Sequence, residues 1–525
     1  MKYRVIIFCG ISALLYSTPN HFQAQDKFED MIKNSNKQFE QLQEESNAEL
    51  DNLKNSIDKE FAQILDKAWK ELELNTGRKL HEKPKLDKIP FARQKQEPVK
   101  EPDVVPEKKP PVTEPEKKTE VKVPEKKPAP KPPVKKVEKK PAPEKPPQVS
   151  KPPKALVPAV ETVSFSFFDT PVKVACDKGL RVPVGNVISS KTITTYFAKM
   201  CQTNYQPSVK HAITIRNQLK LNDYGYCLLL DNLAQAVYGR STNSRNLFVW
   251  FMLVKSGFDA RIGYSENQAY LMLPTKTRLF GAPYYELNNV TYYITFLGTG
   301  KQSVKSLYSY DGKHEGSENQ INMSIDTPPI ITKKVSRKDY SFTYFDKNFA
   351  VPLAVNSNVI DFYEFYPQTS LNVYFDASIS TESAQALLEG IRPIISGKPE
   401  KEAVNMILRF VQTAFEYKTD DEQFQREKHF FVEETLFYPF CDCEDRSFLF
   451  AFLVTNLVGL DVLGLHYPGH VATAVKFNGD VSGDSVTYNN SKYIICDPTY
   501  INANYGECMP KFKKVNPKMV RVQMN

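Results

Sequence analysis

The sequence has 525 residues, of which 41% are hydrophobic and 25% charged, with a formal net charge of +8 at pH 7. A chain of this length exceeds one ordinary hydrophobic core, so we expect roughly two to four structural units. The positive charge is concentrated between about Lys95 and Lys154, where Lys alternates with Glu and Pro and no aromatic residue is interleaved. Since nucleic-acid surfaces combine basic and aromatic side chains, we expect no nucleic-acid partner.

The first 24 residues predict a secretory signal peptide. They run from MKYR through VIIFCGISALLYS into a polar stretch, and cleavage is expected near Ala24. The apolar run has about 13 residues, short of the ~20 that span a bilayer as a helix, and no later segment is apolar enough to do so. Lipidation at Cys9 is an alternative that the bulky Phe8 before it disfavours. We therefore expect an exported protein of the periplasm or cell envelope, without a transmembrane segment.

Residues 26–75 predict one long amphipathic or coiled-coil helix, because apolar residues recur at threes, fours and their sums in a run without Gly or Pro. Such a stripe usually packs against a partner helix, which predicts helix-mediated self-association. The alternative is that the helix folds back on the chain's own globular part. The stripe consists of Phe28, Met31, Phe39, Leu42, Leu50, Leu53, Ile57, Phe61, Ile64 and Leu72.

Residues 82–158 predict a disordered linker. The segment repeats units such as PEKKP and KPPVKK. Proline fixes the backbone dihedral and like charges resist collapse, so we expect an extended polyproline-type spacer.

The remaining chain predicts an α+β fold that contains an internal repeat. SRNLFVWFMLVKSGFDARIGYSENQAYLML (244–273) and DRSFLFAFLVTNLVGLDVLGLHYPGHVATAV (445–475) both read as a helix, a Gly-Phe-Asp or Gly-Leu-Asp turn, and two strands separated by a second turn. We therefore divide this part into a degenerate unit at 159–300, a β-rich region at 301–380 and a C-terminal domain at 381–525.

The C-terminal domain contains the parts of an acyl-transfer triad. Cys443 precedes an apolar run, FLFAFLVTNLV (448–458), which predicts a buried helix ended by Gly459. The amides of a helix start favour an anion and should lower the pKa of this thiol. Glu444 and Asp445 oppose this if they point at the sulfur and Arg446 supports it, so the sequence does not set the net direction. His470 opens a strand after a Pro-Gly turn, and Asp497 ends a second strand before Pro498. Cys443 would be the nucleophile, His470 its base and Asp497 the group that orients the imidazole.

At these residues the sequence resembles the transglutaminase-like branch of the papain-like cysteine enzymes, in an exported bacterial form. The motifs are DCEDRS, PGHVATAV and CDPTY, preceded by AVNMILRFVQTAFEYKTD, and together they cover about Glu400 to Pro510. The resemblance implies a cysteine on a central helix packed against an antiparallel sheet, and chemistry on amide or thioester carbonyls through an acyl-enzyme. Members include peptidases, crosslinkers, deamidases and inactive scaffolds.

The first copy should be inert. When the two segments are aligned, Thr242 falls at the position of Cys443 and Gln268 at that of His470, while TYYITFL supplies no acid near the third position.

Other interpretations of the same residues remain open. Cys441, Cys443, Cys496, Cys508 and His466 could form a metal site, although Cys-Asp-Cys lacks the usual two-residue gap of zinc motifs. His466 is a rival histidine, and Asp442, Glu444 and Asp445 could cap the helix. Without Cys9 the cysteines number seven, so complete pairing would leave one thiol over.

The function expected from the sequence is an exported cysteine enzyme acting on peptide or protein amides. Hydrolysis is favoured over crosslinking because water is always present and no amine-binding site is identified. No cofactor or metal is expected, since there is no phosphate-binding glycine loop and no calcium-loop pattern. The alternative is a non-catalytic cell-envelope tether or assembly protein.

Overall fold

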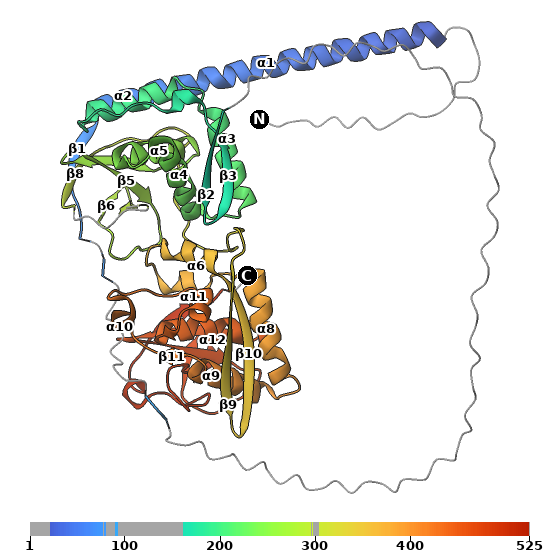
Figure 1. Cartoon of the computed structure of the whole chain (residues 1–525), viewed down its shortest axis with the longest axis vertical. Coiled ribbons are helices and arrows are strands. Elements are labelled where there is room, and N and C mark those ends of the chain that lie inside the picture. The colour runs from blue at the N-terminus through green and yellow to red at the C-terminus, as the bar shows by residue number, and fades with distance from the viewer. Residues whose placement is uncertain are drawn as a thin grey trace. The chain divides into compact units, whose positions relative to one another are not determined.

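The computed structural model describes residues 21–76, 78–79, 90–92, 161–295, 297 and 304–523, and for residues 21–36 it describes the backbone alone. Residues 1–20 of the predicted signal peptide and most of the predicted linker lie outside these ranges. Within them the chain is a mixed α+β protein, as the sequence predicts (Figure 1). No helix in the described part is long and apolar enough to cross a bilayer. The seven described cysteines are free thiols.

The long helix α1 runs from His21 to Lys67 and is shorter at its C-terminal end than the sequence predicts. Residues Trp69–Glu73 form strand β1, which pairs antiparallel with β8 (Ser306–Tyr310). Trp69 packs edge-on against Tyr264 and Tyr310. Strand pairing and aromatic packing therefore override the helical periodicity of this segment.

The last turns of α1 belong to the core of the folded part. Phe61 and Leu65 are buried, and Phe61 lies 5.0 Å from Phe197 of α2 (Ser190–Cys201), which runs beside this end of α1 in Figure 1. Asp58 is also buried and pairs with Lys255 and His314. The helix therefore does fold back on its own globular part, but only over its last three turns.

A six-stranded antiparallel sheet, in the spatial order β1-β8-β4-β5-β7-β6, organises the first unit. The helix α5 packs on β5. A separate hairpin, β2–β3, packs against α3 and α4. The elements are β2 (Thr162–Phe167), β3 (Thr170–Ala175), α3 (Gln206–Gln218), α4 (Asp223–Tyr238), α5 (Thr242–Lys255), β4 (Arg261–Ser265), β5 (Gln268–Pro274), β6 (Tyr284–Leu287) and β7 (Val290–Thr295).

The region predicted to be β-rich is only partly so. It contains β8 and a long hairpin, β9 (Val335–Tyr344) and β10 (Lys347–Asn356), but the chain then forms the helices α6 (Ser357–Glu364) and α7 (Leu371–Phe375). Residues 90–92, inside the predicted linker, are described as well. Phe91 forms an isolated parallel bridge with Ile501.

A five-stranded antiparallel sheet, in the spatial order β15-β16-β14-β13-β17, organises the C-terminal domain. The helix α12 packs on β13 and β14, and α9 and α11 pack on α12. The elements are α8 (Thr381–Ile395), α9 (Glu400–Thr413), β11 (Glu416–Tyr417), α10 (Asp420–Phe424), α11 (Val432–Phe437), β12 (Phe440–Cys441), α12 (Cys443–Leu457), β13 (Asp461–Tyr467), β14 (His470–Lys476), β15 (Ser485–Tyr488), β16 (Ser491–Cys496) and β17 (Lys518–Arg521).

The two sheets share one topology. Without β1, the spatial order of the first sheet is β8-β4-β5-β7-β6, and that of the second is β17-β13-β14-β16-β15. At each position in space, the two sheets therefore have the strand of the same rank in chain order. The hairpins β6–β7 and β15–β16 even share an Asn-Asn turn, Asn288-Asn289 and Asn489-Asn490, with positive φ at all four residues. The repeat noted in the sequence therefore has a counterpart in the sheets.

Asp58 provides a test of how α1 is held. Its neighbour Lys255 is almost fully buried, so Asp58→Ala would leave a buried charge unpaired and should lower the free energy of unfolding by about 3–5 kcal/mol. The matched control is Asp51→Ala on the exposed part of α1, which should change it by less than about 0.5 kcal/mol. Both values would come from denaturant unfolding.

The stability difference between wild type and Asp58→Ala should also depend on pH. Burial raises the pKa of the Asp58 carboxyl, but the bond to His314 and the charge of Lys255 outweigh this and lower the pKa. A depressed carboxyl pKa adds stability above the unfolded value of about 3.9, and that stability is lost as pH falls through the folded value. The difference between wild type and Asp58→Ala should therefore shrink below about pH 4. A difference that persists unchanged to lower pH would contradict this account.

Candidate active site

Helix α12 begins at Cys443, with Asp442 as its N-cap residue. It starts earlier than the apolar run alone indicates and ends at Leu457, just before Gly459, whose φ is +76°. The amide of Asp442 donates to Asp445 Oδ2 at 3.2 Å, so one of the acids near the helix start does cap it, as the alternative interpretation proposed. Cys443 therefore lies in the first turn of the helix, as predicted.

Two buried polar side chains fix this helix start against its neighbours. Arg446 donates to the carbonyl oxygens of Gln412 (3.2 Å) and Phe415 (2.7 Å). The hydroxyl of Ser447 lies 2.8 Å from the carbonyl oxygen of Cys443 and 3.1 Å from that of Val471, the residue after His470. Ser447 thus ties the first turn of α12 to the start of β14.

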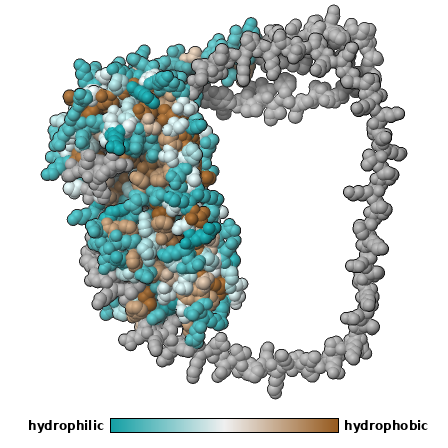
Figure 2. All heavy atoms as spheres, viewed as in Figure 1, coloured by the Kyte–Doolittle hydropathy of each residue, from teal (hydrophilic) through white to brown (hydrophobic). Residues whose placement is uncertain are grey.

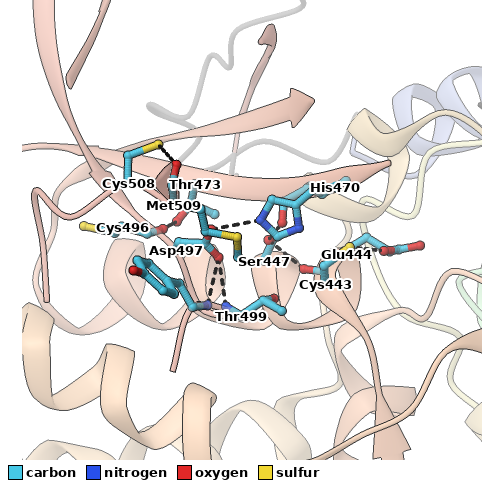
Figure 3. Close-up of polar contacts among 12 residues, drawn as sticks. Cys443, Glu444, Ser447, His470, Thr473, Cys496, Asp497, Thr499, Cys508 and Met509 are labelled. Carbon is cyan, nitrogen blue, oxygen red and sulfur yellow. Dashed lines mark hydrogen bonds and ion pairs between the residues drawn. The ribbon is translucent and has the colours of Figure 1, made fainter. Parts of the chain in front are cut away.

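His470 and Asp497 form a buried pair. His470 Nε2 lies 2.9 Å from Asp497 Oδ2, and both residues are 2% exposed. The second carboxylate oxygen, Oδ1, accepts the amides of Thr499 (2.9 Å) and Tyr500 (3.2 Å), which fixes its orientation (Figure 3). Asp497 follows β16 directly, because the strand ends at Cys496.

The imidazole of His470 is held flat against Phe512, with ring centroids 5.1 Å apart and 5° between the planes. Among the described residues, its Nδ1 atom has no hydrogen-bond partner. Figure 3 shows the ring between Asp497 on one side and Cys443 and Glu444 on the other. One ring nitrogen is therefore committed to the carboxylate, and the other is free to exchange a proton.

The sulfur of Cys443 is hydrogen-bonded to a carboxylate. Sγ lies 2.9 Å from Glu444 Oε2, and the side chain is fully buried. Burial raises the pKa of the thiol well above its usual value, and the charges of Glu444 and Asp442 raise it further, whereas the backbone of Val471 lowers it. The net direction that the sequence left open is therefore upward, because Glu444 does point at the sulfur. The thiol is protonated here.

Glu444 is the ionised member of a buried acidic cluster. Its carboxylate pairs with His429 Nδ1 at 2.9 Å. Burial raises the pKa of Glu444, but the bond to His429 outweighs this and lowers it to about 2, while the pKa of His429 rises. Burial and the charge of Glu444 raise the pKa of Asp445 to about 7. Burial, and to a smaller extent the charge of Asp445, raise the pKa of Asp420 to about 10.

These groups include the two places in the described chain where a metal ion could bind. Asp420, His429 and Glu444 bring ligand atoms within 4.8 Å of one another, and so do Asp442, Cys443 and Glu444. Among the described residues, neither carboxylate oxygen of the buried Asp442 has a hydrogen-bond partner, and carboxylate oxygens suit a divalent cation. The metal site considered from the sequence is not assembled, since Cys441, Cys496, Cys508 and His466 form no such group in the described part.

A cavity of about 720 Å³ reaches the site. Cys443 and His470 both line it, together with His429 and Glu444. His466 lines the same cavity and is half-buried, so it contacts the site without belonging to the pair formed with Asp497. Two of the three predicted residues are therefore paired directly, and the third opens onto the same space.

Sequence reasoning missed several residues of this site. His429 and Phe512 occur in no recognisable motif, and Gln412 is a polar residue on the buried face of an amphipathic helix. The amide of Gln412 donates to the carbonyl oxygens of Asp497 (3.1 Å), Tyr500 (2.8 Å) and Ala503 (3.0 Å), which holds the loop after β16. A buried Gln within a helical apolar face was the only signal available for it.

In the first unit the matching positions carry other residues. Helix α5 begins at Thr242 and strand β5 at Gln268, as α12 and β14 begin at Cys443 and His470. Leu271, three residues after Gln268, pairs with Thr295 on the neighbouring strand. In the C-terminal domain Thr473, three residues after His470, pairs with Cys496 in the same way. The counterpart of Asp497 is therefore Phe296, which lies outside the described residues.

No family model, no curated protein and no solved structure matches this chain.

Removing the charge beside the sulfur should activate it. Glu444→Gln eliminates the carboxylate that keeps the thiol protonated, so alkylation of Cys443 by iodoacetamide at pH 7 should speed up about tenfold for each unit by which its pKa falls. The rate would be followed by mass spectrometry of the Cys443 peptide. Glu427→Gln, a carboxylate of the same cavity, is the matched control. Equal rates in wild type and Glu444→Gln would refute the assigned role of this carboxylate.

Proposed function

We propose that the chain is an exported cysteine enzyme that hydrolyses peptide or protein amides through a transglutaminase-like Cys-His-Asp triad. Cys443 is the nucleophile, His470 the base and later the acid, and Asp497 the group that orients the imidazole. The observation that carries the proposal is the His470–Asp497 pair, since Nδ1 of this imidazole has no hydrogen-bond partner among the described residues and His470 lines the same cavity as Cys443. The export assignment rests on the sequence of residues 1–24.

The reaction begins from a protonated thiol. As the substrate carbonyl enters the cavity, the thiol exchanges its bond to Glu444 for one to His470 Nδ1. The sulfur then attacks the carbonyl carbon while the proton moves to the imidazole. The resulting imidazolium is stabilised by Asp497 and returns the proton to the leaving amine.

The acyl-enzyme is then hydrolysed by the reverse route. His470 takes a proton from water, the oxygen attacks the thioester carbonyl, and the sulfur leaves as the proton returns to it. Amides of the first helical turn have no acceptor within the helix, so the start of α12 offers donors for the oxyanion.

Variants at the two neighbouring cysteines test the assignment. Cys443→Ala should abolish cleavage of a peptide library, a loss of about 10³-fold or more, because no other group in the triad can form the acyl bond. Cys441→Ala, two residues away and also buried, should keep most of the activity. Cleavage would be read by mass spectrometry of the library. Residual hydrolysis by Cys443→Ala would show that another residue is the nucleophile.

A second candidate function, an envelope tether or assembly protein, is favoured by the exposed apolar stripe of α1. Phe39, Leu42, Leu50 and Leu53 are 67%, 64%, 48% and 58% exposed. The stripe repeats every 11 residues, since Phe39 and Leu50 stand 11 apart and so do Leu42 and Leu53, and the repeat continues to Phe61. An 11-residue repeat is the pattern of straight or slightly right-handed helix assemblies.

We propose that a second copy of the chain covers this stripe. The same face is already buried at Phe61, where the chain's own first unit covers it. A membrane surface fits less well, because the polar face between Lys37 and Ile57 carries five acids and only two lysines. Hydrophilic residues also prevail on the part of α1 that Figure 2 colours.

Sedimentation of matched double variants tests this self-association. Leu42→Glu with Leu53→Glu places charges in the seam and should convert a dimer or higher oligomer into a monomer. Gln41→Glu with Asn52→Glu adds the same charge, also 11 residues apart, on the opposite face of the helix and should leave the oligomer intact. A wild-type chain that sediments as a monomer at micromolar concentration would overturn the proposal. Deleting the helix is a poorer test, because Asp58 and Phe61 belong to the folded core.

A further inference from the structure

The rim of the active-site cavity is basic, and it is built from the first unit and the C-terminal domain. The cavity lining contains four Lys and Arg side chains, all exposed: Lys276 and Arg278 from the loop after β5, and Lys518 and Arg521 from β17. Within the described part of the chain, none of the four forms an ion pair, whereas many other surface cations do. Four unpaired cations around one opening are available to a ligand.

The acids of the same cavity do not cancel this charge. Glu444 is neutralised by its pair with His429. Burial raises the pKa of the Asp376 carboxyl, while the amide of Gln523 and the charge of Arg521 lower it. Asp376 and Glu427 are thus the remaining acids of the lining, two carboxyl groups against four cations. The cavity therefore has an excess of positive charge near its opening, and such an excess raises the local concentration of anions.

The loop that carries Lys276 and Arg278 is held in place by residues between α6 and α7, in the region before the C-terminal domain. The amide of Phe280 donates to the carbonyl oxygen of Gln368 (2.9 Å), and Thr369 Oγ1 donates to the carbonyl oxygen of Arg278 (2.9 Å). The side chain of Gln368 in turn accepts the amide of His429 at 2.7 Å. The basic loop is therefore connected through one residue to the His429–Glu444 pair beside the sulfur.

We propose that this rim selects substrates that carry carboxylate groups close to the amide bond, so that the enzyme acts on acidic peptide segments. The first unit, without a triad of its own, then contributes specificity through Lys276 and Arg278. This proposal rests on the proposed function for the cleavage of the amide bond, whereas the recognition of carboxylates by the rim does not depend on it. The alternative is that the four side chains are merely solvated, in which case neutralising them changes nothing.

Binding to an inactive variant separates recognition from catalysis. The full chain carrying Cys443→Ala would be titrated against one short fluorescein-labelled peptide in three versions, with Glu, Gln or Lys at the same positions, and read by fluorescence anisotropy. The Glu version should bind about three- to tenfold more tightly than the Gln version, and the Lys version most weakly. The preference should weaken between 50 mM and 500 mM salt, because the cations are exposed.

Double variants that neutralise two rim cations at a time identify the residues responsible for the preference. Lys276→Gln with Arg278→Gln should remove most of the preference for the Glu peptide, and Lys518→Gln with Arg521→Gln should remove the rest. The control double variant is Lys173→Gln with Lys347→Gln, which removes the same charge from exposed sites on β3 and β10 and should keep the preference. A control that loses the preference equally would show a non-specific effect of net charge and overturn the assignment to the rim.

The two proposals can fail separately. If the active chain cleaves Glu, Gln and Lys peptides with equal kcat/KM and the inactive variant binds them equally, the rim has no role in selection while the cysteine chemistry stands. If no peptide is cleaved but the Glu peptide is bound selectively through the rim, the recognition stands and the hydrolytic function fails.

Discussion

The hydrogen bond between His470 Nε2 and Asp497 Oδ2 is the interaction on which the functional interpretation depends. It joins the first residue of β14 to the residue that follows β16, and these strands lie side by side through the pairing of Thr473 with Cys496. Because one ring nitrogen is held by the carboxylate and the ring face by Phe512, the other nitrogen has a fixed direction. Without this bond Cys443 would be one more buried thiol, comparable to Cys227 or Cys496.

The structure builds the same sheet twice, and the residues of the proposed triad belong to the second copy. Helices α5 and α12 start at equivalent points, but Thr242 in the first has neither the nucleophilicity nor the acidity of Cys443 in the second. The shared topology therefore accounts for the packing of both sheets, and the proposed function rests on a few side chains at strand and helix ends. Even the buried arginine near each helix start has changed partners, since Arg245 pairs with Asp231 whereas Arg446 donates to backbone carbonyls.

The sequence predicted the features that depend on local pattern. The start of α12 near Cys443, the turn before His470, the strand before Asp497 and the repeat of a helix and hairpin all follow from short motifs. It failed where distant contacts decide the outcome. Trp69–Glu73 leaves the helical pattern because β8 pairs with it, and α6 and α7 interrupt a region whose Tyr, Ser and Thr content favours strands.

The charge state of the site could not be predicted from local sequence pattern, for the same reason. The effect of a helix start on a thiol can be read from the sequence, but the direction in which the Glu444 side chain points cannot. Nor could His429 be assigned, since it lies 14 positions before Cys443 and meets Glu444 only through the packing of the chain around α12. The partners of a buried ionisable group are set by tertiary structure, and they determine its pKa.

A protonated thiol beside an ionised carboxylate changes what the proposed mechanism requires of the histidine. A preformed thiolate–imidazolium pair needs surroundings that favour the sulfur anion, and here burial, Glu444 and Asp442 all oppose it. Each unit by which the pKa of a thiol exceeds the ambient pH reduces the thiolate fraction about tenfold. Proton transfer to His470 would therefore have to accompany attack on the carbonyl, as in serine hydrolases, instead of preceding it. The ion pair of Glu444 with His429 makes this arrangement stable at rest, because it keeps the carboxylate charged and directed at the sulfur until a substrate competes for the thiol.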